Sequence, residues 1–232
     1  YVMCPTFAGA VEAVREGRAD LAVLPIENTT SGAISEVYDL LLDAGLHLVG
    51  DLRFRVRHCL LGVAGAGIAD LRRIYAHPQA AAQCSDFLSG LEDCEVVLYE
   101  DTAGSGQKTA ALGDRSVAAI ASEEAGRLAG LEVLSAEVAN RAENYTRFVV
   151  VSPEPRPIPP GVPAKTSIVM TVGNRPGALM DALDVFTAAD VNLVKLESRP
   201  IPDNPSDELF YLDFAGSVAD PEVAAMLETL TT

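Results

Sequence analysis

The residues best suited to chemistry lie at positions 142–148, directly before the apolar run 149–151. Asn144, Thr146 and Arg147 place an amide, a hydroxyl and a guanidinium beside a β-branched segment that can hold them rigidly. Such a set of hydrogen-bond donors can recognise a small anion. Polar residues of these types also occur at ordinary strand edges. The stretch alone is therefore compatible with an anion-binding site and with a strand edge that has no such role.

A second polar segment follows a short apolar run near the N-terminus. Residues 21–25 predict a buried parallel strand, and Glu27 and Asn28 come directly after it. Ligands of open α/β sheets bind beyond the carboxyl ends of the strands. These two side chains are therefore candidates for a site.

Small and hydroxyl-bearing residues then precede a predicted helix; they are Thr29, Thr30, Ser31 and Gly32. Their hydroxyls can cap the helix, and the backbone N–H groups of its first turn can bind a carboxylate or a phosphate. Ordinary helix capping uses the same residue types, and the local pattern leaves both roles open.

Other motifs for chemistry are incomplete. Residues 104–109 resemble a phosphate-binding loop, but Gln107 stands where that motif requires a glycine before Lys108. The three histidines form no HExxH zinc motif, and no serine lies on a G-x-S-x-G turn. We therefore expect neither a metal nor a cofactor.

Composition limits the possible partners and the compartment. The chain has 232 residues and a formal net charge of −16, which argues against nucleic-acid or anionic-membrane partners because phosphate contacts need clustered Lys and Arg. We see no basic leader and no apolar run near the roughly 20 residues that span a bilayer. The four cysteines have neither metal-site spacing nor disulfide-scaffold density, which indicates reduced thiols. We expect a cytoplasmic protein.

Six prolines within residues 152–165 predict an extended linker, because proline fixes φ and removes a backbone donor. Before the linker, alternating patterns predict an α/β domain with helices on a mostly parallel sheet. The expected helices are 7–14, 34–42, 78–88, 102–112 and 123–128, and the expected strands are 21–25, 48–50, 52–56, 74–77, 96–99 and 116–121.

After the linker, the patterns predict the order βαββα. A strand at 166–172 is followed by a helix that Pro176 opens, strands at 192–198 and 209–214, and a helix that starts at Pro221. A ferredoxin-like unit would need one more strand.

Several segments, in this order along the chain, resemble the prephenate dehydratase family. They are Pro-Ile-Glu-Asn-Thr at 25–29 with Ser31 and Gly32, His-Pro-Gln at 77–79 with Gln83 and Cys84, Ala-Ala-Ile-Ala-Ser at 118–122, and Asn-Tyr-Thr-Arg-Phe at 144–148. Residues 174–179 and 197–200 are similar to the two signature motifs of the ACT regulatory domain that accompanies these enzymes.

The resemblance implies an α/β fold with a two-lobed, periplasmic-binding-protein-like catalytic domain over residues 1–151. A linker over 152–165 and a ferredoxin-like (βαββαβ) ACT domain over 166–232 would follow. One lobe would contain residues 1 to about 50 with 146–151, and the other roughly 51–137. The family's first strand and glycine-rich turn, and the last ACT strand, are not in this sequence, so we expect a piece of a longer polypeptide.

The implied reaction is the decarboxylating dehydration of prephenate to phenylpyruvate in L-phenylalanine biosynthesis, which needs no cofactor. The resemblance assigns catalysis to Thr146, as an oriented donor or proton relay to the leaving hydroxide. Arg147 would either compensate carboxylate charge or support Thr146. The implied substrate-binding residues are Glu27, Asn28, Thr29, Ser31, Gly32, Asn144, Arg147 and Phe148.

The resemblance also implies feedback inhibition by L-phenylalanine, bound by the ACT domain at an interface of a homodimer or homotetramer. The implied effector-binding residues are Gly177, Ala178, Leu179, Asn192, Leu193, Glu197, Ser198, Arg199 and Pro200. Two alternatives stay open: an arogenate dehydratase, which acts on the amino-acid analogue of prephenate, and a non-catalytic amino-acid sensor.

Overall fold

The computed structural model describes residues 1–91, 93–159, 162–201 and 204–231. Pro160 and Gly161 of the predicted linker, and Pro202, Asp203 and Thr232 of the predicted second domain, lie outside the described residues. The chain forms two compact units, Tyr1–Pro155 and Arg156–Thr232. The described residues between Ser152 and Lys165 belong to neither a helix nor a strand.

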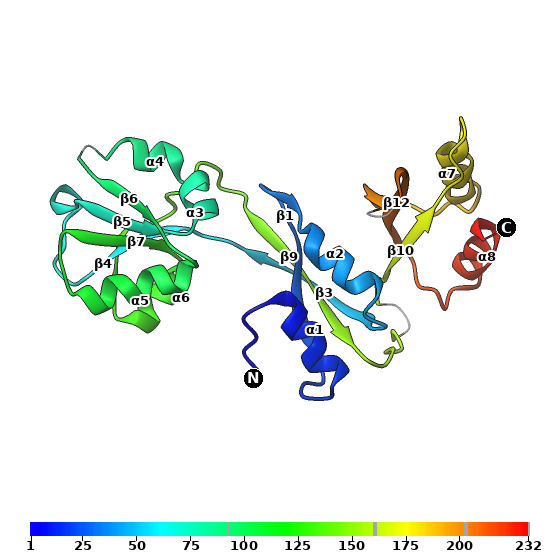
Figure 1. Cartoon of the computed structure of the whole chain (residues 1–232), viewed down its shortest axis with the longest axis horizontal. Helices are drawn as coiled ribbons and strands as arrows, with labels where there is room; N and C mark the ends of the chain where they lie inside the picture. The colour runs from blue at the N-terminus through cyan, green and yellow to red at the C-terminus, as the bar shows by residue number, and fades with distance from the viewer. Residues whose placement is uncertain (92, 160–161, 202–203, 232) are drawn as a thin grey trace. The chain divides into compact units, whose positions relative to one another are not determined.

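The first sheet has the strand order β2–β1–β9–β3, and all of its pairs are antiparallel (Figure 1). Its strands are β1 (Ala22–Asn28), β2 (Gly32–Ala33), β3 (His47–Arg55) and β9 (Tyr145–Ser152); the helices α1 (Phe7–Arg15) and α2 (Ser35–Leu42) accompany it. Leu24 and Val149 are partners in the register and are each 1% exposed. Val14 of α1 and Val37 of α2 are buried as well, so helices and sheet share an apolar core.

The second sheet has the strand order β6–β5–β7–β4–β8. Its strands are β4 (Cys59–Gly62), β5 (Arg73–Ala76), β6 (Glu95–Leu98), β7 (Val117–Ala121) and β8 (Glu132–Ser135); its helices are η1 (Ile68–Asp70), α3 (Pro78–Gln83), α4 (Ser85–Ser89), α5 (Thr102–Leu112) and α6 (Glu123–Ala129). β5 pairs in parallel with β6 and β7, whereas β4 pairs antiparallel with β7 and β8.

The apolar strands of the second sheet are covered on both faces. Leu60, Ile74 and Ile120 form a cluster with residues of α3 and α4. Leu61 belongs to a separate cluster with residues of α5 and α6. Helix layers on both faces explain why β4 and β7 are buried at every position.

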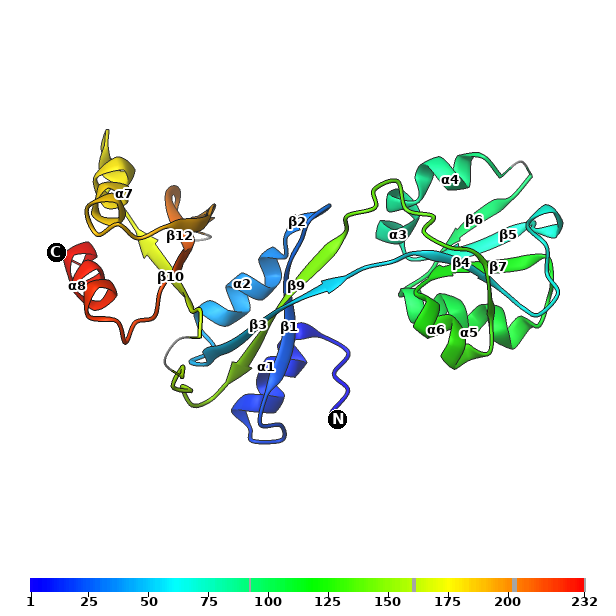
Figure 2. The ribbon, with the colours of Figure 1, turned by 180° about the vertical axis from the view of Figure 1, so that it is seen from behind.

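The prediction of a mostly parallel sheet is wrong for the first sheet and holds for only part of the second. β9 lies between β1 and β3 although 116 residues separate Asn28 from Asn144 (Figure 2). The chain leaves the first sheet through β3, builds the second sheet and returns through β9. Apolar patterns within single strands do not reveal such a return, which reverses the strand direction.

Most predicted elements of the first unit are confirmed within about three residues. The predicted helix 78–88 is instead two helices, α3 and α4, which meet at Cys84, and the pair of strands at 48–56 is one strand, β3, with an irregularity between Leu48 and Gly50. The strands β2, β4 and β8 were missed, and β9 was anticipated only as the apolar run 149–151. Ser122 accepts a hydrogen bond from Ala125 N at 3.1 Å, as a predicted helix cap should.

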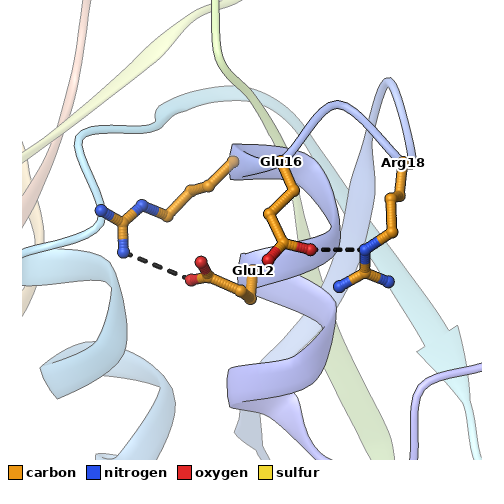
Figure 3. Close-up of polar contacts among 4 residues, drawn as sticks. Glu12, Glu16 and Arg18 are labelled. Atoms are coloured by element: carbon orange, nitrogen blue, oxygen red, sulfur yellow. Dashed lines mark hydrogen bonds and ion pairs between the residues drawn. The ribbon is translucent and has the colours of Figure 1, made fainter.

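Pairs of opposite charge lie on α1 and just after its end, as Figure 3 shows. Arg15 Nη1 lies 3.3 Å from Glu12 Oε2, and Arg18 Nε donates to Glu16. The four side chains are about half exposed, and such pairs contribute little to stability. They pair charges locally within an acidic chain.

The second unit contains a three-stranded antiparallel sheet in the order β10–β12–β11, and two helices. Its elements are β10 (Lys165–Thr171), α7 (Ala178–Ala188), β11 (Leu193–Ile201), β12 (Asn204–Ala215) and α8 (Pro221–Leu230). Phe186 of α7 packs edge-on against Phe214 of β12, with ring centroids 5.4 Å apart. The predicted order βαββα is confirmed.

Pro176 does not open α7, contrary to the prediction. The helix begins at Ala178, and Gly177 precedes it with a φ of +85°. That left-handed conformation suits glycine, because a side chain would be strained there. The chain therefore turns sharply at Gly177 before the helix starts.

Candidate functional site

Residues 29–31 form the turn between β1 and β2 rather than the start of a helix. β1 continues through Glu27 to Asn28, and the helix α2 is preceded by Ile34, which makes no side-chain capping bond. The expectation that these residues sit directly before the helix and cap it is therefore wrong, because β2 and Ile34 lie between them and α2. The reason is local: Asn28 draws the turn towards its own side chain, which is a common alternative to helix capping.

Asn28 lies at the centre of the turn and is 6% exposed. Its Oδ1 accepts hydrogen bonds from the backbone N–H groups of Thr30 at 2.9 Å and Ser31 at 3.2 Å. Its Nδ2 donates to Asn144 Oδ1 at 2.8 Å and to Thr146 Oγ1 at 3.0 Å. Three residues predicted from two separate motifs are thus joined by hydrogen bonds through Asn28.

Side chains from the second sheet complete this network. Gln83 of α3 accepts from Asn144 Nδ2 at 2.8 Å and donates through Nε2 to Thr30 Oγ1 at 2.6 Å. His58 Nε2 lies 2.8 Å from the same Gln83 oxygen, and Gln79 donates to Ser31 Oγ at 2.7 Å. The network therefore joins the two sheets of the first unit.

Sequence reasoning missed His58, Gln79 and Gln83 as site residues. The glutamines were part of a family motif, and they are the polar positions of a short helix that is otherwise proline and alanine. Two polar side chains in a helix that is otherwise apolar could have indicated that Gln79 and Gln83 belong to a site. For His58, which precedes the buried run of β4, no local signal distinguishes a site residue from a core histidine.

His58 is held neutral near pH 7. Burial lowers the pKa of its imidazole, and the hydrogen bond with Gln83 opposes this effect only in part. A neutral ring carries one donor nitrogen and one acceptor nitrogen.

Arg147 occupies the other face of β9, since neighbouring strand residues point to opposite sides. Its Nε donates to Asp51 Oδ2 at 2.9 Å, and its Nη1 lies 3.9 Å from Glu27 Oε2. The Arg147 side chain is 9% exposed, so these carboxylates compensate a largely buried charge. The structure thus places Glu27 with Arg147 rather than with Thr146.

Thr29 and Phe148 have contacts of different kinds. Thr29 Oγ1 accepts from the backbone N–H of Tyr145 at 2.9 Å, so this hydroxyl ties the turn to β9. Phe148 lies on the same side of β9 as Thr146; in the register with β3, Phe148 pairs with Leu52 and Thr146 with Phe54. Leu52 and Phe54 are 42% and 60% exposed, so an open apolar surface adjoins the Thr146 hydroxyl.

In the second unit, the predicted effector residues fall into two groups. Gly177, Ala178 and Leu179 line a cavity of about 260 Å³, together with residues that include Arg175 and Phe210. The remaining predicted residues do not line it; they are Asn192, Leu193, Glu197, Ser198, Arg199 and Pro200.

Within the described ranges, no group of three or more His, Cys, Asp or Glu side chains could hold a metal ion. No helix in the same part of the chain has the length and apolarity to cross a membrane.

The fold is a mixed α/β fold with two sheets in its first unit. Residues near both sheets form one hydrogen-bonded network, in which amide side chains connect to the Thr146 hydroxyl. Residues 1–156 match the family described as prephenate dehydratase, and the chain belongs to that family. The bifunctional chorismate mutase/prephenate dehydratase of Enterobacter agglomerans is 40% identical over 229 residues, which are 99% of this chain and 59% of that protein.

A plant protein and a solved structure are similar to the chain as well. Arogenate dehydratase/prephenate dehydratase 2, chloroplastic, of Arabidopsis thaliana is 43% identical over 96% of this chain and 60% of its own length. A prephenate dehydratase from Arthrobacter aurescens in complex with L-Phe is 31% identical with a TM-score of 0.87, over 99% of this chain and 76% of that one. The chain spans about three fifths of the length of the two curated relatives.

Proposed function

We propose that this chain catalyses the decarboxylating dehydration of prephenate to phenylpyruvate. In this reaction the ring carboxylate leaves as carbon dioxide, the ring hydroxyl leaves as hydroxide and takes up a proton to become water, and the ring becomes aromatic. The protein must hold two carboxylates and assist a poor leaving group. Membership of the family supports the reaction.

The hydrogen bond from Asn28 Nδ2 to Thr146 Oγ1, at 3.0 Å, carries the assignment of Thr146. Because the Thr146 oxygen accepts this bond, its own proton points elsewhere. Among the described residues, no acceptor takes that proton. Thr146 can therefore donate to the departing hydroxide as an oriented donor or relay, since a threonine hydroxyl is too weak an acid to act alone.

Other residues would bind the substrate or support the site. The proposed polar wall contains Asn28, Thr29, Ser31, Gly32 and Asn144, with Phe148 excluding water. For Arg147, the ion pair with Asp51 supports a buttressing role behind β9. Direct contact between Arg147 and a substrate carboxylate remains the alternative.

Turnover of prephenate by the full chain tests the proposal. We expect phenylpyruvate to form, and we expect Thr146→Ala to lower kcat by about 10²- to 10⁴-fold while the unfolding midpoint changes little. Thr146→Ser keeps the hydroxyl and should retain much of the rate. A near-normal rate for Thr146→Ala would remove the mechanism.

Arogenate is the second candidate substrate, because the Arabidopsis relative is named for both activities. Kinetics with both substrates side by side decides the preference. Binding of L-phenylalanine without turnover of either substrate would instead support a sensor.

We also propose that the second unit is an ACT regulatory domain that binds L-phenylalanine in a homodimer or homotetramer. The cavity beside Gly177, Ala178 and Leu179 lies at the start of α7, where backbone N–H groups can take a carboxylate. The Arthrobacter aurescens relative in complex with L-Phe supports this ligand.

A further inference from the structure

Two backbone N–H groups fix the direction of the hydrogen bonds that run from Asn28 through Asn144 and Gln83 to His58. Those of Thr30 and Ser31 both donate to one amide atom of Asn28, which must be the oxygen because an amide nitrogen does not accept. The other atom is then Nδ2, and it faces the backbone carbonyl of Tyr145 at 3.3 Å. Amide orientations are usually assigned from such partners, and here these partners allow one orientation.

The orientation of the Asn28 amide determines the orientations of the Asn144 and Gln83 amides, and through them the position of the proton on the His58 imidazole. Since Asn28 Nδ2 donates to Asn144 Oδ1, the Asn144 atom that faces Gln83 is Nδ2. Nδ2 donates, so the Gln83 atom that meets it is Oε1. The same oxygen lies 2.8 Å from His58 Nε2, and an oxygen of this kind only accepts. The His58 proton must therefore sit on Nε2.

We propose that His58, as the Nε2–H tautomer, is a positioning residue that holds the amide of Gln83 and, through Asn144 and Thr30, supports the position of the Asn28 amide beside Thr146. With Nδ1–H instead, the Nε2 lone pair would face the Gln83 oxygen and favour a flip of the Gln83 amide. A flipped Gln83 would turn its own donors against Asn144 Nδ2 and would lose its donation to Thr30.

Burial makes this contact hard to replace. His58 is 6% exposed and Asn144 is 2% exposed, so solvent offers little substitute for a lost bond. The hydroxyl of Thr30, which accepts from Gln83, is also bonded to Asn28 Oδ1. Gln83 therefore reaches Asn28 along two routes, from Oε1 through Asn144 and from Nε2 through Thr30. His58 bonds Oε1 and so holds the amide group from which both routes begin.

The tautomer can be measured without any assumption about the reaction. A ¹⁵N–¹H correlation spectrum of the full chain labelled with ¹⁵N-histidine should show Nε2 of His58 protonated and Nδ1 unprotonated. The His58 signals are identified by their loss in His58→Gln. A protonated Nδ1 or a signal averaged between tautomers would overturn the proposal.

Two variants separate positioning from folding, and this kinetic arm rests on the proposed function. His58→Gln keeps a donor near the Nε2 position, whereas His58→Leu keeps the bulk without the donor. We expect His58→Leu to lower kcat by about tenfold, which is the factor that corresponds to the loss of one hydrogen bond. KM should change little. His58→Gln should recover most of this rate, and His47→Leu, at an exposed histidine of β3, should match the wild type.

Unchanged kcat in His58→Leu, or an equal loss in His58→Gln, would contradict the positioning role. Absence of turnover in the wild-type chain would instead contradict the proposed function, and the spectrum would still test the tautomer.

Discussion

At the scale of single residues, Asn28 is the most constrained side chain of the site. Its oxygen faces only donors, and its nitrogen faces the acceptors Asn144 Oδ1 and Tyr145 O. A residue in this position cannot be replaced by one that accepts on both sides. The network is therefore specific for an amide at position 28.

Asn28→Asp places a carboxylate oxygen against those acceptors. We expect this change to lower the free energy of unfolding by about 3 kcal/mol and to reduce turnover strongly. Asn140→Asp is a matched control, because Asn140 is exposed and its nitrogen faces the Ser85 hydroxyl, which can donate instead. Urea unfolding of both variants measures the difference, and equal stabilities would contradict the assigned orientation.

Cys84 gives the folded chain a predictable pH dependence. Burial, with a smaller contribution from Cys59, raises the pKa of its thiol from 9.0 to about 12. Above about pH 9 the unfolded chain loses this proton while the folded chain keeps it, so stability must fall as pH rises towards 12. The expected contribution is about 1.4 kcal/mol per pH unit.

Urea unfolding between about pH 9 and about pH 10.5 tests this expectation. The stability of Cys84→Ala should fall less steeply with pH than that of the wild type, although the variant is less stable overall because of the cavity it creates. Parallel pH profiles would show that Cys84 ionises normally in the folded chain.

At the scale of elements, two helical glycines differ in the space around them: one is packed closely against a neighbouring strand, and the other is not. A Cβ on Gly126 of α6 would lie 2.9 Å from Leu61 Cδ2, whereas a Cβ on Gly106 of α5 would lie 3.9 Å from Leu131 Cδ1. Leu61 is fully buried and has little room to move. α6 can therefore approach β4 only because position 126 has no side chain.

Gly106→Ala and Gly126→Ala should change stability in opposite directions. Gly106→Ala should raise the free energy of unfolding by about 0.5–1 kcal/mol, because alanine favours the helix. Gly126→Ala should lower it by about 1 kcal/mol, since overpacking outweighs the same helical gain. Denaturant unfolding measures both, and a stabilised Gly126→Ala would contradict the close contact with Leu61.

At the scale of the whole molecule, the proposed effector and substrate must act on each other reciprocally. If L-phenylalanine weakens prephenate binding, prephenate weakens L-phenylalanine binding by the same factor, about 5- to 150-fold for typical couplings. Thr146→Ala allows the measurement by calorimetry, because it should bind prephenate with little turnover. Affinities that do not change in the presence of the other ligand would contradict the regulatory proposal.

The sequence predicted the residue types of the site better than their arrangement. Asn28 was identified from one motif and Asn144 and Thr146 from another, and the structure brings them into contact. The expected capping of the helix by residues 29–31 is wrong, because a side chain that bonds its own turn can override a capping pattern. His58 was missed because its role depends on a glutamine 25 positions away.

The sequence by itself determined most of the helices and strands, the proline-rich segment between two units and the family. These features follow from short segments, through local backbone preferences, apolar periodicity and the order of motifs. They can therefore be read without knowledge of the fold. Tertiary structure alone decided that β9 lies beside β1, that Arg147 faces away from Thr146, and that His58 reaches the network through Gln83. These features depend on pairings between distant segments, where the return of the chain sets strand direction and register.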